Sequence, residues 1–287
     1  MRTRGFVFGA LMVTAVAILA LVGCPAALQA PLVEVNFALT DAPVDDELVT
    51  AVRITVSGVR VNESADADEG EGTWTDIVVD PPVPVDLLTL RDGVTFAIGS
   101  VWLAGGTQIN QIRLVVDGAE IDYDGTTYPA KLSTADTTGL KIVRAFDVPL
   151  TGEITIAVDF DARRSIVMTG PPPAPTFKLK PVLRAVVEGE AGSISGSGPA
   201  DHVVYAYRDG TWADSEAIPD AEGLTFTHAY TSAGLGDPDT DGTWTYRLSF
   251  LEPGVYDLVL VEDAVGTVVT IAPDATVTER HTTEVNF

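Results

Sequence analysis

The sequence has a single cysteine, Cys24, and only three histidines among its 287 residues. One thiol cannot form an intrachain disulfide, so the folded part must be stabilised by burial of apolar side chains. No His-Glu-x-x-His pair, Walker loop or dinucleotide-type glycine loop occurs. Where a Gly-x-Ser-x-Gly nucleophile elbow needs serine, the stretch at 192–196 has Ile194. Because no catalytic motif is recognisable, we predict that the protein is not an enzyme.

Basic residues are also scarce. There are 17 lysines and arginines against 41 aspartates and glutamates, which gives a formal net charge of −24 at pH 7. Binding to nucleic acid needs a basic surface that displaces the counterions of the phosphates. The composition therefore argues against nucleic acid as a partner and favours an acidic protein kept soluble by its charge.

Only one long apolar run is present, at 5–23, and it follows Arg2 and Arg4. A positively charged start and an apolar stretch are typical of a secretory signal, although the length would also suit a transmembrane helix. The run ends in LVGC at 21–24, which resembles the lipobox of bacterial lipoproteins. This resemblance implies cleavage before Cys24 and a diacylglyceryl thioether on its sulfur. An uncleaved membrane anchor and an ordinary signal with a chance cysteine are the alternatives.

We therefore predict a signal peptide at 1–23 and a lipidated tether at 24–31, whose prolines prevent a helix. Several acyl chains hold a protein stably on a membrane, whereas one binds only marginally. This prediction places the protein in the cell envelope, as a membrane-anchored lipoprotein that faces the periplasm or the cell exterior. The predicted partners are the membrane, through the lipid on Cys24, and a glycan or an envelope protein.

Beyond the tether, most segments are short and alternate between apolar and polar residues, as half-buried β-strands do. In Gly152–Asp161, for example, the even-numbered positions from Ile154 to Phe160 are apolar. Helical periodicity is limited to a turn or two at 41–50 and 162–168. The pattern predicts an all-β protein of two antiparallel β-sandwiches, immunoglobulin-like or transthyretin-like. Expected strands are 33–40, 51–61, 73–79, 111–116, 140–148, 152–161, 177–187, 203–207, 225–230, 243–250, 255–262, 267–271 and 282–287.

A stretch rich in glycine and serine at 189–199 marks a domain boundary. We predict an N-terminal sandwich at 32–188, a linker at 189–191 and a C-terminal sandwich at 192–287. In the second sandwich, Trp244, Tyr246, Leu248 and Phe250 alternate strictly and predict one apolar wall.

Short motifs follow one another in the first sandwich: LTDAP at 39–43, VDLLTL at 85–90, LAGGT at 103–107, QIRL at 111–114, GLKI at 139–142, DFD at 159–161 and LKPVLRA at 179–185. In this order they resemble domain-of-unknown-function family 4382, which occurs in bacterial exported proteins. The resemblance covers about Val33 to Val187 and implies a β-rich envelope domain without an assigned role.

The second half contains GSISG at 192–196, Val203, Tyr205 and Tyr207 in VVYAY at 203–207, DGTW at 241–244 and LEPGVY at 251–256. This pattern is similar to carboxypeptidase-regulatory-like or transthyretin-like sandwiches. The resemblance implies an accessory or adhesive module.

One acidic loop has the ligand spacing of a calcium site. Asp237, Asp239 and Asp241 stand at positions 1, 3 and 5, and Gly242 stands at position 6. Position 12, where a bidentate glutamate belongs, is Leu248. Calcium bound by these three aspartates is one hypothesis; the other is a metal-free Asp-Gly turn between two strands.

Further candidate ligand-binding residues are Asp41, Asp159 and Asp161, whose carboxylates could converge on a metal or on sugar hydroxyls. An Asx-turn at Asp41 and a solvated face of an edge strand for Asp159 and Asp161 are the alternatives. Trp212 follows a turn and is the tryptophan best placed to stack on a sugar, although it could also be packed.

Together these observations predict a lipid-anchored envelope protein that acts as a non-catalytic binding, adhesion or scaffold module. One alternative is a glycan-acting hydrolase with paired carboxylates. Another is a structural subunit of an envelope complex, which would expose an apolar patch to its partner.

Overall fold

The computed structural model describes residues 30–42, 48–68, 74–132, 139–170, 175–220, 224–236, 243–263 and 265–287. Cys24, the apolar run at 5–23 and the three aspartates Asp237, Asp239 and Asp241 lie outside these residues. Lipidation and calcium binding therefore stay predictions. In the part of the chain that is described, no helix is long and apolar enough to cross a bilayer.

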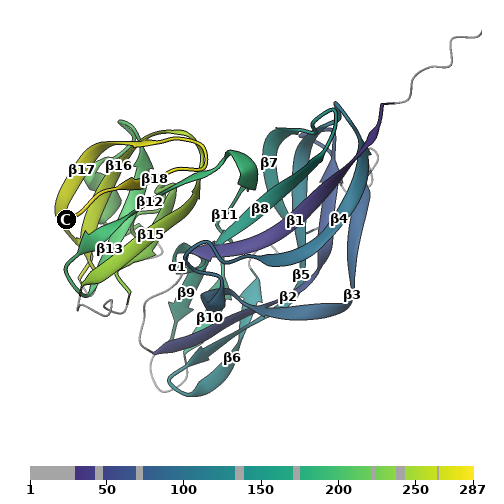
Figure 1. The fold of residues 1–287 in the computed structure, drawn as a ribbon. Helices are drawn as coiled ribbons and strands as arrows, with labels where there is room; N and C mark the ends of the chain where they lie inside the picture. Colours follow the sequence, from purple (N-terminus) through teal and green to yellow (C-terminus); the bar gives the residue numbers. More distant parts are fainter. Residues whose placement is uncertain are drawn as a thin grey trace, which may run out of the picture.

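The protein is all-β, as the alternating pattern predicts (Figure 1). Within the described ranges, four sheets form two sandwich-like domains, the first from strands β1 to β11 and the second from β12 to β18. The first contains β1 (Leu32–Ala42), β2 (Val49–Asn62), β3 (Thr75–Asp86), η1 (Leu87–Thr89), β4 (Phe96–Ala104), β5 (Gln108–Tyr123), β6 (Thr126–Leu132), β7 (Leu140–Asp147), β8 (Glu153–Asp161), α1 (Ala162–Ser165), β9 (Ile166–Thr169), β10 (Thr176–Leu179) and β11 (Leu183–Val187). After η2 (Glu188–Glu190), the second contains β12 (Gly192–Gly198), β13 (His202–Arg208), η3 (Asp214–Ala217), β14 (Thr231–Gly234), β15 (Trp244–Leu251), β16 (Gly254–Glu262), β17 (Thr267–Val277) and β18 (Thr282–Glu284).

The N-terminal sandwich packs a four-stranded sheet, ordered β11-β8-β1-β4, against a larger sheet ordered β3-β2-β5-β6-β10-β9, in which β7 also pairs with β5. Alternate residues of the central strands point into the core, because successive side chains of a strand lie on opposite faces. Phe37 of β1 and Ile156 of β8 meet Ile112 and Leu114 of β5 in one buried cluster. Most neighbouring strands are antiparallel, but β1 with β8 and β6 with β10 are parallel.

The C-terminal sandwich packs the sheet β15-β12-β18 against the sheet β14-β13-β16-β17. Its core contains Val204 of β13 and Tyr246 and Leu248 of β15. The last strand, β18, runs parallel to β12. At Gly196 of β12, a Cβ would lie only 1.7 Å from the carbonyl oxygen of Val285. Only glycine permits this close approach of the C-terminal segment to β12.

Two strand predictions are wrong. The segment 225–230 does not form a strand, because Phe226 has a φ of 53°, outside the β region, and the next residues form β14 instead. The expected strand at 177–187 is divided into β10 and β11, which belong to different sheets. The division falls at Pro181, which has no N–H to donate to a neighbouring strand.

The predicted apolar wall of β15 extends only to Leu248. Phe250 has a φ of 53° and packs outside the C-terminal core, while Leu251 is fully buried within it. Phe250 lies against Ala157 and Val186 of the N-terminal sandwich. A side chain predicted for the core therefore belongs to the contact between the two sandwiches.

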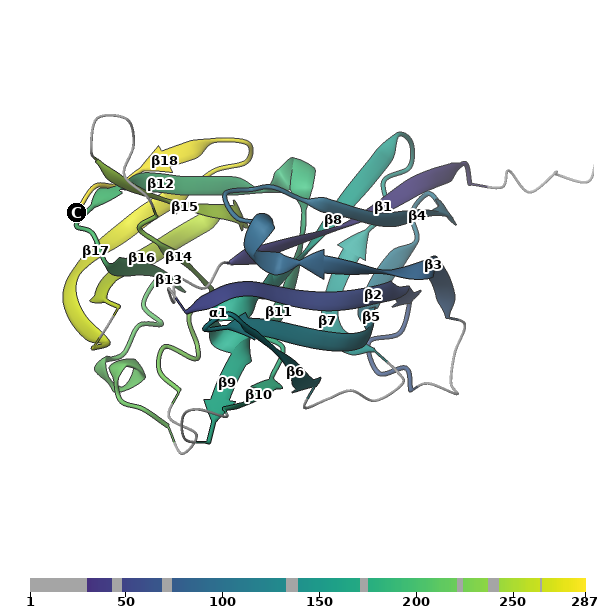
Figure 2. The ribbon, with the colours of Figure 1, turned by 90° about the horizontal axis from the view of Figure 1, so that it is seen from below.

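The outward face of the sheet β11-β8-β1-β4 has two different ends. Along β1 and β8, Glu34 lies beside Glu153 at one end and Thr40 lies beside Asp159 at the other. The C-terminal sandwich covers the end with Asp159, whereas the end where β1 begins is exposed. Both views agree with this arrangement: the C-terminal sandwich lies on the left and the start of β1 on the right (Figures 1 and 2).

Candidate functional site

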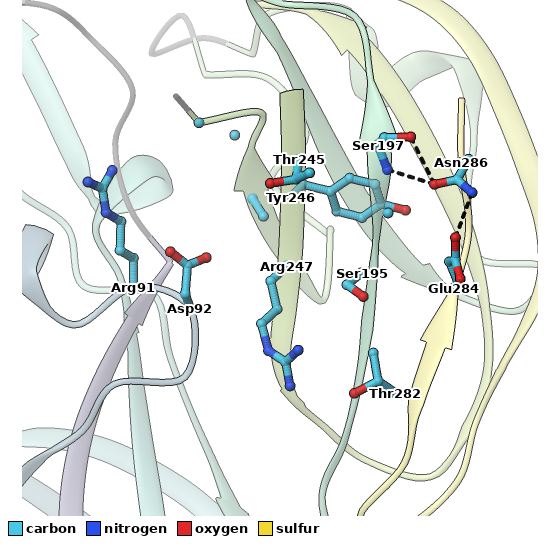
Figure 3. A pocket seen from close by; sticks show the side chains of 14 residues that line it. Arg91, Asp92, Ser195, Ser197, Thr245, Tyr246, Arg247, Thr282, Glu284 and Asn286 are labelled. Carbon is cyan, nitrogen blue, oxygen red and sulfur yellow. Dashed lines mark hydrogen bonds between the residues drawn. The ribbon is translucent and has the colours of Figure 1, made fainter. Parts of the chain in front are cut away.

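A cleft of about 850 Å³ lies between the two sandwiches (Figure 3). One wall is the outward face of the sheet β15-β12-β18, and the other is the loop with Arg91 and Asp92 that follows η1. Serine, threonine, asparagine, glycine and charged residues make up most of the lining. The cleft therefore offers many hydrogen-bonding groups to a ligand and more polar than apolar surface.

The register of the sheet arranges these polar side chains in rows. Arg247 of β15, Ser195 of β12 and Glu284 of β18 are neighbours in one row. In the next row, the Ser197 N–H donates to Asn286 Oδ1 at 2.8 Å, and Asn286 Nδ2 donates to Glu284 Oε1 at 2.9 Å (Figure 3). These bonds orient the amide and the carboxylate before any ligand binds, which reduces the entropy lost on binding.

The opposite wall is held in place by η1. Asp86 caps this short helix with its carboxylate, and Leu87 within it is fully buried. The chain then turns through Asp92 and Gly93, whose φ values are 61° and 87°. A Cβ on Gly93 would lie 3.2 Å from Ser249 Oγ of β15. This close contact places the loop against the C-terminal sandwich.

The charges of the cleft balance one another. Arg91 and Arg247 contribute two positive charges, and Asp92 and Glu284 contribute two negative charges. Elsewhere the chain is strongly acidic, with a net charge of −24. A neutral polar ligand would therefore meet a locally neutral surface, with hydrogen-bonding groups of both kinds.

Below the cleft, arginines of the N-terminal sandwich bind the C-terminal sandwich. Arg184 of β11 forms an ion pair of 2.6 Å with Asp159, and both side chains are largely buried. Arg184 also donates to the carbonyl oxygens of Ser249 (3.1 Å) and Phe250, and it lies over the ring of Tyr230 at 4.7 Å. Burial raises the pKa of Asp159, and the positive charge of Arg184 opposes this shift.

A second buried pair reinforces the first. Arg164 of α1 binds Asp161 at 2.7 Å and donates to backbone carbonyls of the C-terminal sandwich, including that of Ala229. The neighbouring Arg163 binds Asp263 at 2.7 Å. Hydrogen bonds in which the donor or the acceptor is ionised are stronger than those between neutral groups, and these are largely shielded from solvent.

Glu252 at the β15–β16 turn completes this junction by binding Arg144 of β7 and Arg208 of β13. Arg208 also lies over the rings of Tyr230, at 4.4 Å, and Tyr256, at 4.7 Å. Burial raises the pKa of Tyr256, so its hydroxyl stays protonated and donates to the Glu252 carbonyl oxygen at 2.9 Å. The two sandwiches are thus joined by ion pairs, such as those of Arg144 with Glu252 and Arg163 with Asp263, and by the guanidinium of Arg184 over the ring of Tyr230.

The structure places the predicted aspartates within this junction. Asp159 and Asp161 are 3% and 2% exposed, so the expectation of a solvated edge is wrong for them. Both line a crevice of about 330 Å³, where each carboxylate binds an arginine. Asp41 is also buried, and its Oδ1 accepts the N–H of Ala162 at 2.9 Å. Among the described residues, no group of three His, Cys, Asp or Glu is arranged to hold a metal ion.

Trp212 lies away from the cleft, in an aromatic cluster of the C-terminal sandwich. It is half-buried, meets Tyr207 edge-on at 5.0 Å and stacks on Phe226 at 6.2 Å. Its ring therefore packs against other rings in this structure.

The sequence prediction missed the residues that line the cleft. A signal for them was present, because Thr245 and Arg247 alternate with the apolar residues of β15 and so had to face outward. The contribution of Arg91 could not be predicted, since it depends on how the two sandwiches pack.

The fold and the cleft thus define a β-sandwich protein with a polar groove where its two domains meet. The family model described as "Domain of unknown function (DUF4382)" matches residues 33–181, just over half of the chain, so the chain belongs to this family. This finding confirms the resemblance of the first sandwich. Curated proteins give no significant match.

Solved structures give distant likenesses. GBS52, the minor pilin of Streptococcus agalactiae, has 11% identity and a TM-score of 0.23, over 88% of this chain and 94% of that chain. A candidate adhesin of Bacteroides ovatus has 11% identity and a TM-score of 0.21, over 90% and 93%. A fimbrial protein of the same species has 9% identity and a TM-score of 0.17, over 90% of this chain and 49% of that chain.

Proposed function

We propose that the protein is a lipid-anchored envelope protein that acts as a non-catalytic binding module, with the cleft between its sandwiches as the ligand site. The observation that carries this proposal is the polar, charge-balanced lining of the cleft. Hydroxyl and amide groups with paired charges suit a neutral ligand rich in hydroxyl groups. An oligosaccharide of the envelope or of the cell exterior fits this description.

The anchor and the domain division are parts of the proposal. The lipid on Cys24 would hold the module at the membrane, and residues 32–188 and 192–287 would form its two domains. The position of η2 between β11 and β12 supports a boundary at 189–191. We further propose that 192–287 is a carboxypeptidase-regulatory-like sandwich.

A glycan-binding screen with the whole protein tests the cleft. We expect binding of a neutral oligosaccharide, and we expect Arg247→Gln to weaken it about 10- to 100-fold, because a hydrogen bond to a charged group contributes about 1.5–3 kcal/mol. Ser195→Ala should weaken it by a smaller factor. Arg53→Gln is the matched control, since Arg53 binds Asp122 on the surface of the N-terminal sandwich.

The same screen separates the alternatives. Binding that Arg247→Gln leaves unchanged would place the ligand outside the cleft. Release of shortened sugars from the bound glycan would instead favour the hydrolase alternative. If no glycan binds, the proposed ligand class is wrong.

A further inference from the structure

An exposed apolar tip lies at the end of the N-terminal sandwich where β1 begins. Three side chains form it: Leu32 of β1, Trp102 of β4 and Leu150 of the β7–β8 turn, which are 62%, 58% and 68% exposed. They are among the most exposed large apolar residues of the described chain. Water contact at three such side chains is unfavourable unless something covers them.

The strand register brings the first two together. Leu32 pairs with Ala104, and Glu34 pairs with Trp102, so Leu32 and Trp102 are diagonal neighbours on one face of the β1–β4 pair. Diagonal neighbours of this kind lie within reach of an aromatic side chain. That face is the outward one, because Val33 between Leu32 and Glu34 is fully buried in the core.

Leu150 joins them through the glycine turn after β4. The Gly105 N–H donates to the Pro31 carbonyl oxygen at 2.8 Å, and a Cβ on Gly105 would lie 2.8 Å from the carbonyl oxygen of Leu150. A Cβ on Gly106 would lie 3.5 Å from Leu150 Cδ2. The turn therefore holds Leu150 next to the residue at which the chain enters the sandwich.

The distance from this tip to Cys24 is limited by the chain itself. Leu32, the first residue of β1, is eight residues after Cys24, and at 3.3–3.6 Å per residue this part of the chain spans at most about 29 Å. Lipid on Cys24 would keep the tip within this distance of the bilayer surface. Tryptophan with neighbouring aliphatic side chains is the composition that favours the membrane–water interface.

We propose that Leu32, Trp102 and Leu150 insert into the interface of the bilayer that holds the lipid anchor. This inference rests on the proposed lipidation of Cys24. The tip sets the orientation of the module: the C-terminal sandwich, at the opposite end of the sheet, faces away from the membrane (Figure 1). The cleft is then presented to ligands at a distance from the lipid surface.

Fluorescence quenching by brominated lipid tests the insertion. The lipidated protein is reconstituted into vesicles of phosphatidylcholine. This zwitterionic lipid is chosen because Glu34 and Glu153 lie beside the tip. We expect lipid brominated near the headgroup to quench part of the tryptophan emission. Trp102→Phe should abolish this quenchable component, whereas Trp212→Phe should keep it. Leu150→Asp should reduce it, because a carboxylate at the interface is costly to desolvate.

Vesicle flotation separates the two claims. Protein that floats with the vesicles but shows no quenching, or shows equal quenching in Trp102→Phe, overturns the insertion and leaves the anchor intact. Protein that does not float overturns the lipid anchor and the insertion with it.

Discussion

Replacing Arg184 with methionine should lower the free energy of unfolding by about 3–5 kcal/mol, because the change leaves the carboxylate of Asp159 buried without its partner. For a protein of this size, that loss corresponds to a fall in Tm of about 6–20 °C. Arg184 also binds two carbonyl oxygens of the C-terminal sandwich and lies over Tyr230. Thermal unfolding followed by circular dichroism measures the effect.

A surface pair provides the matched control. Arg53 and Asp122 form an ion pair with side-chain exposures of 35% and 20%, and Arg53→Met should cost less than about 1 kcal/mol. Adding Asp159→Leu to Arg184→Met should recover much of the lost stability, since an apolar pair needs no desolvation of charge. Equal effects of Arg184→Met and Arg53→Met would contradict the assignment of Arg184 to the junction.

Replacing Cys24 with alanine should abolish incorporation of an alkyne-tagged fatty acid and release the protein from the membrane fraction. The sulfur is the only one in the chain that can carry a thioether-linked lipid, because no other cysteine exists. Several acyl chains supply the membrane affinity, at about 0.8 kcal/mol for each buried CH₂. Cell fractionation with in-gel detection of the tag measures both effects.

Ala26→Ser, two residues further along the tether, is the matched control and should keep both label and membrane attachment. If the wild-type protein carries no label and the Cys24→Ala variant stays in the membrane, the result would favour the uncleaved transmembrane helix. Label that survives the substitution would place the lipid elsewhere.

The all-β fold could be predicted because period-two alternation depends only on which residues face a core. In β8, alternation assigned the four even-numbered residues from Ile154 to Phe160 to the core face, and the structure confirms this. It could not reveal that the other face, with Asp159 and Asp161, is covered by a second domain. Local sequence does not contain that information, since the cover comes from residues about 70 to 100 positions away.

Local backbone conformation was a second reason why the ends of some strands could not be predicted from the sequence. The positive φ values of Phe226 and Phe250 end or redirect strands that the apolar pattern extends. Both are phenylalanines, which favour strands and rarely adopt positive φ. The packing between the sandwiches overrides that preference at Phe250, where the ring lies against Ala157 and Val186.

The candidate site was only partly accessible to sequence analysis for the same reason. Polar side chains such as Thr245 and Arg247 could be placed on an outward face of β15, but a cleft exists only where Arg91 and Asp92 stand opposite them. Long-range packing creates the site. Conversely, the calcium spacing of Asp237, Asp239 and Asp241 is a purely local signal, and it stays a prediction.

The intact mass of the protein extracted from membranes tests the central claim most directly. A lipid-anchored module predicts a chain that starts at Cys24 and carries the additional mass of a diacylglyceryl group and an acyl group at this residue. A chain that retains residues 1–23, or one in which Cys24 is unmodified, would contradict the account.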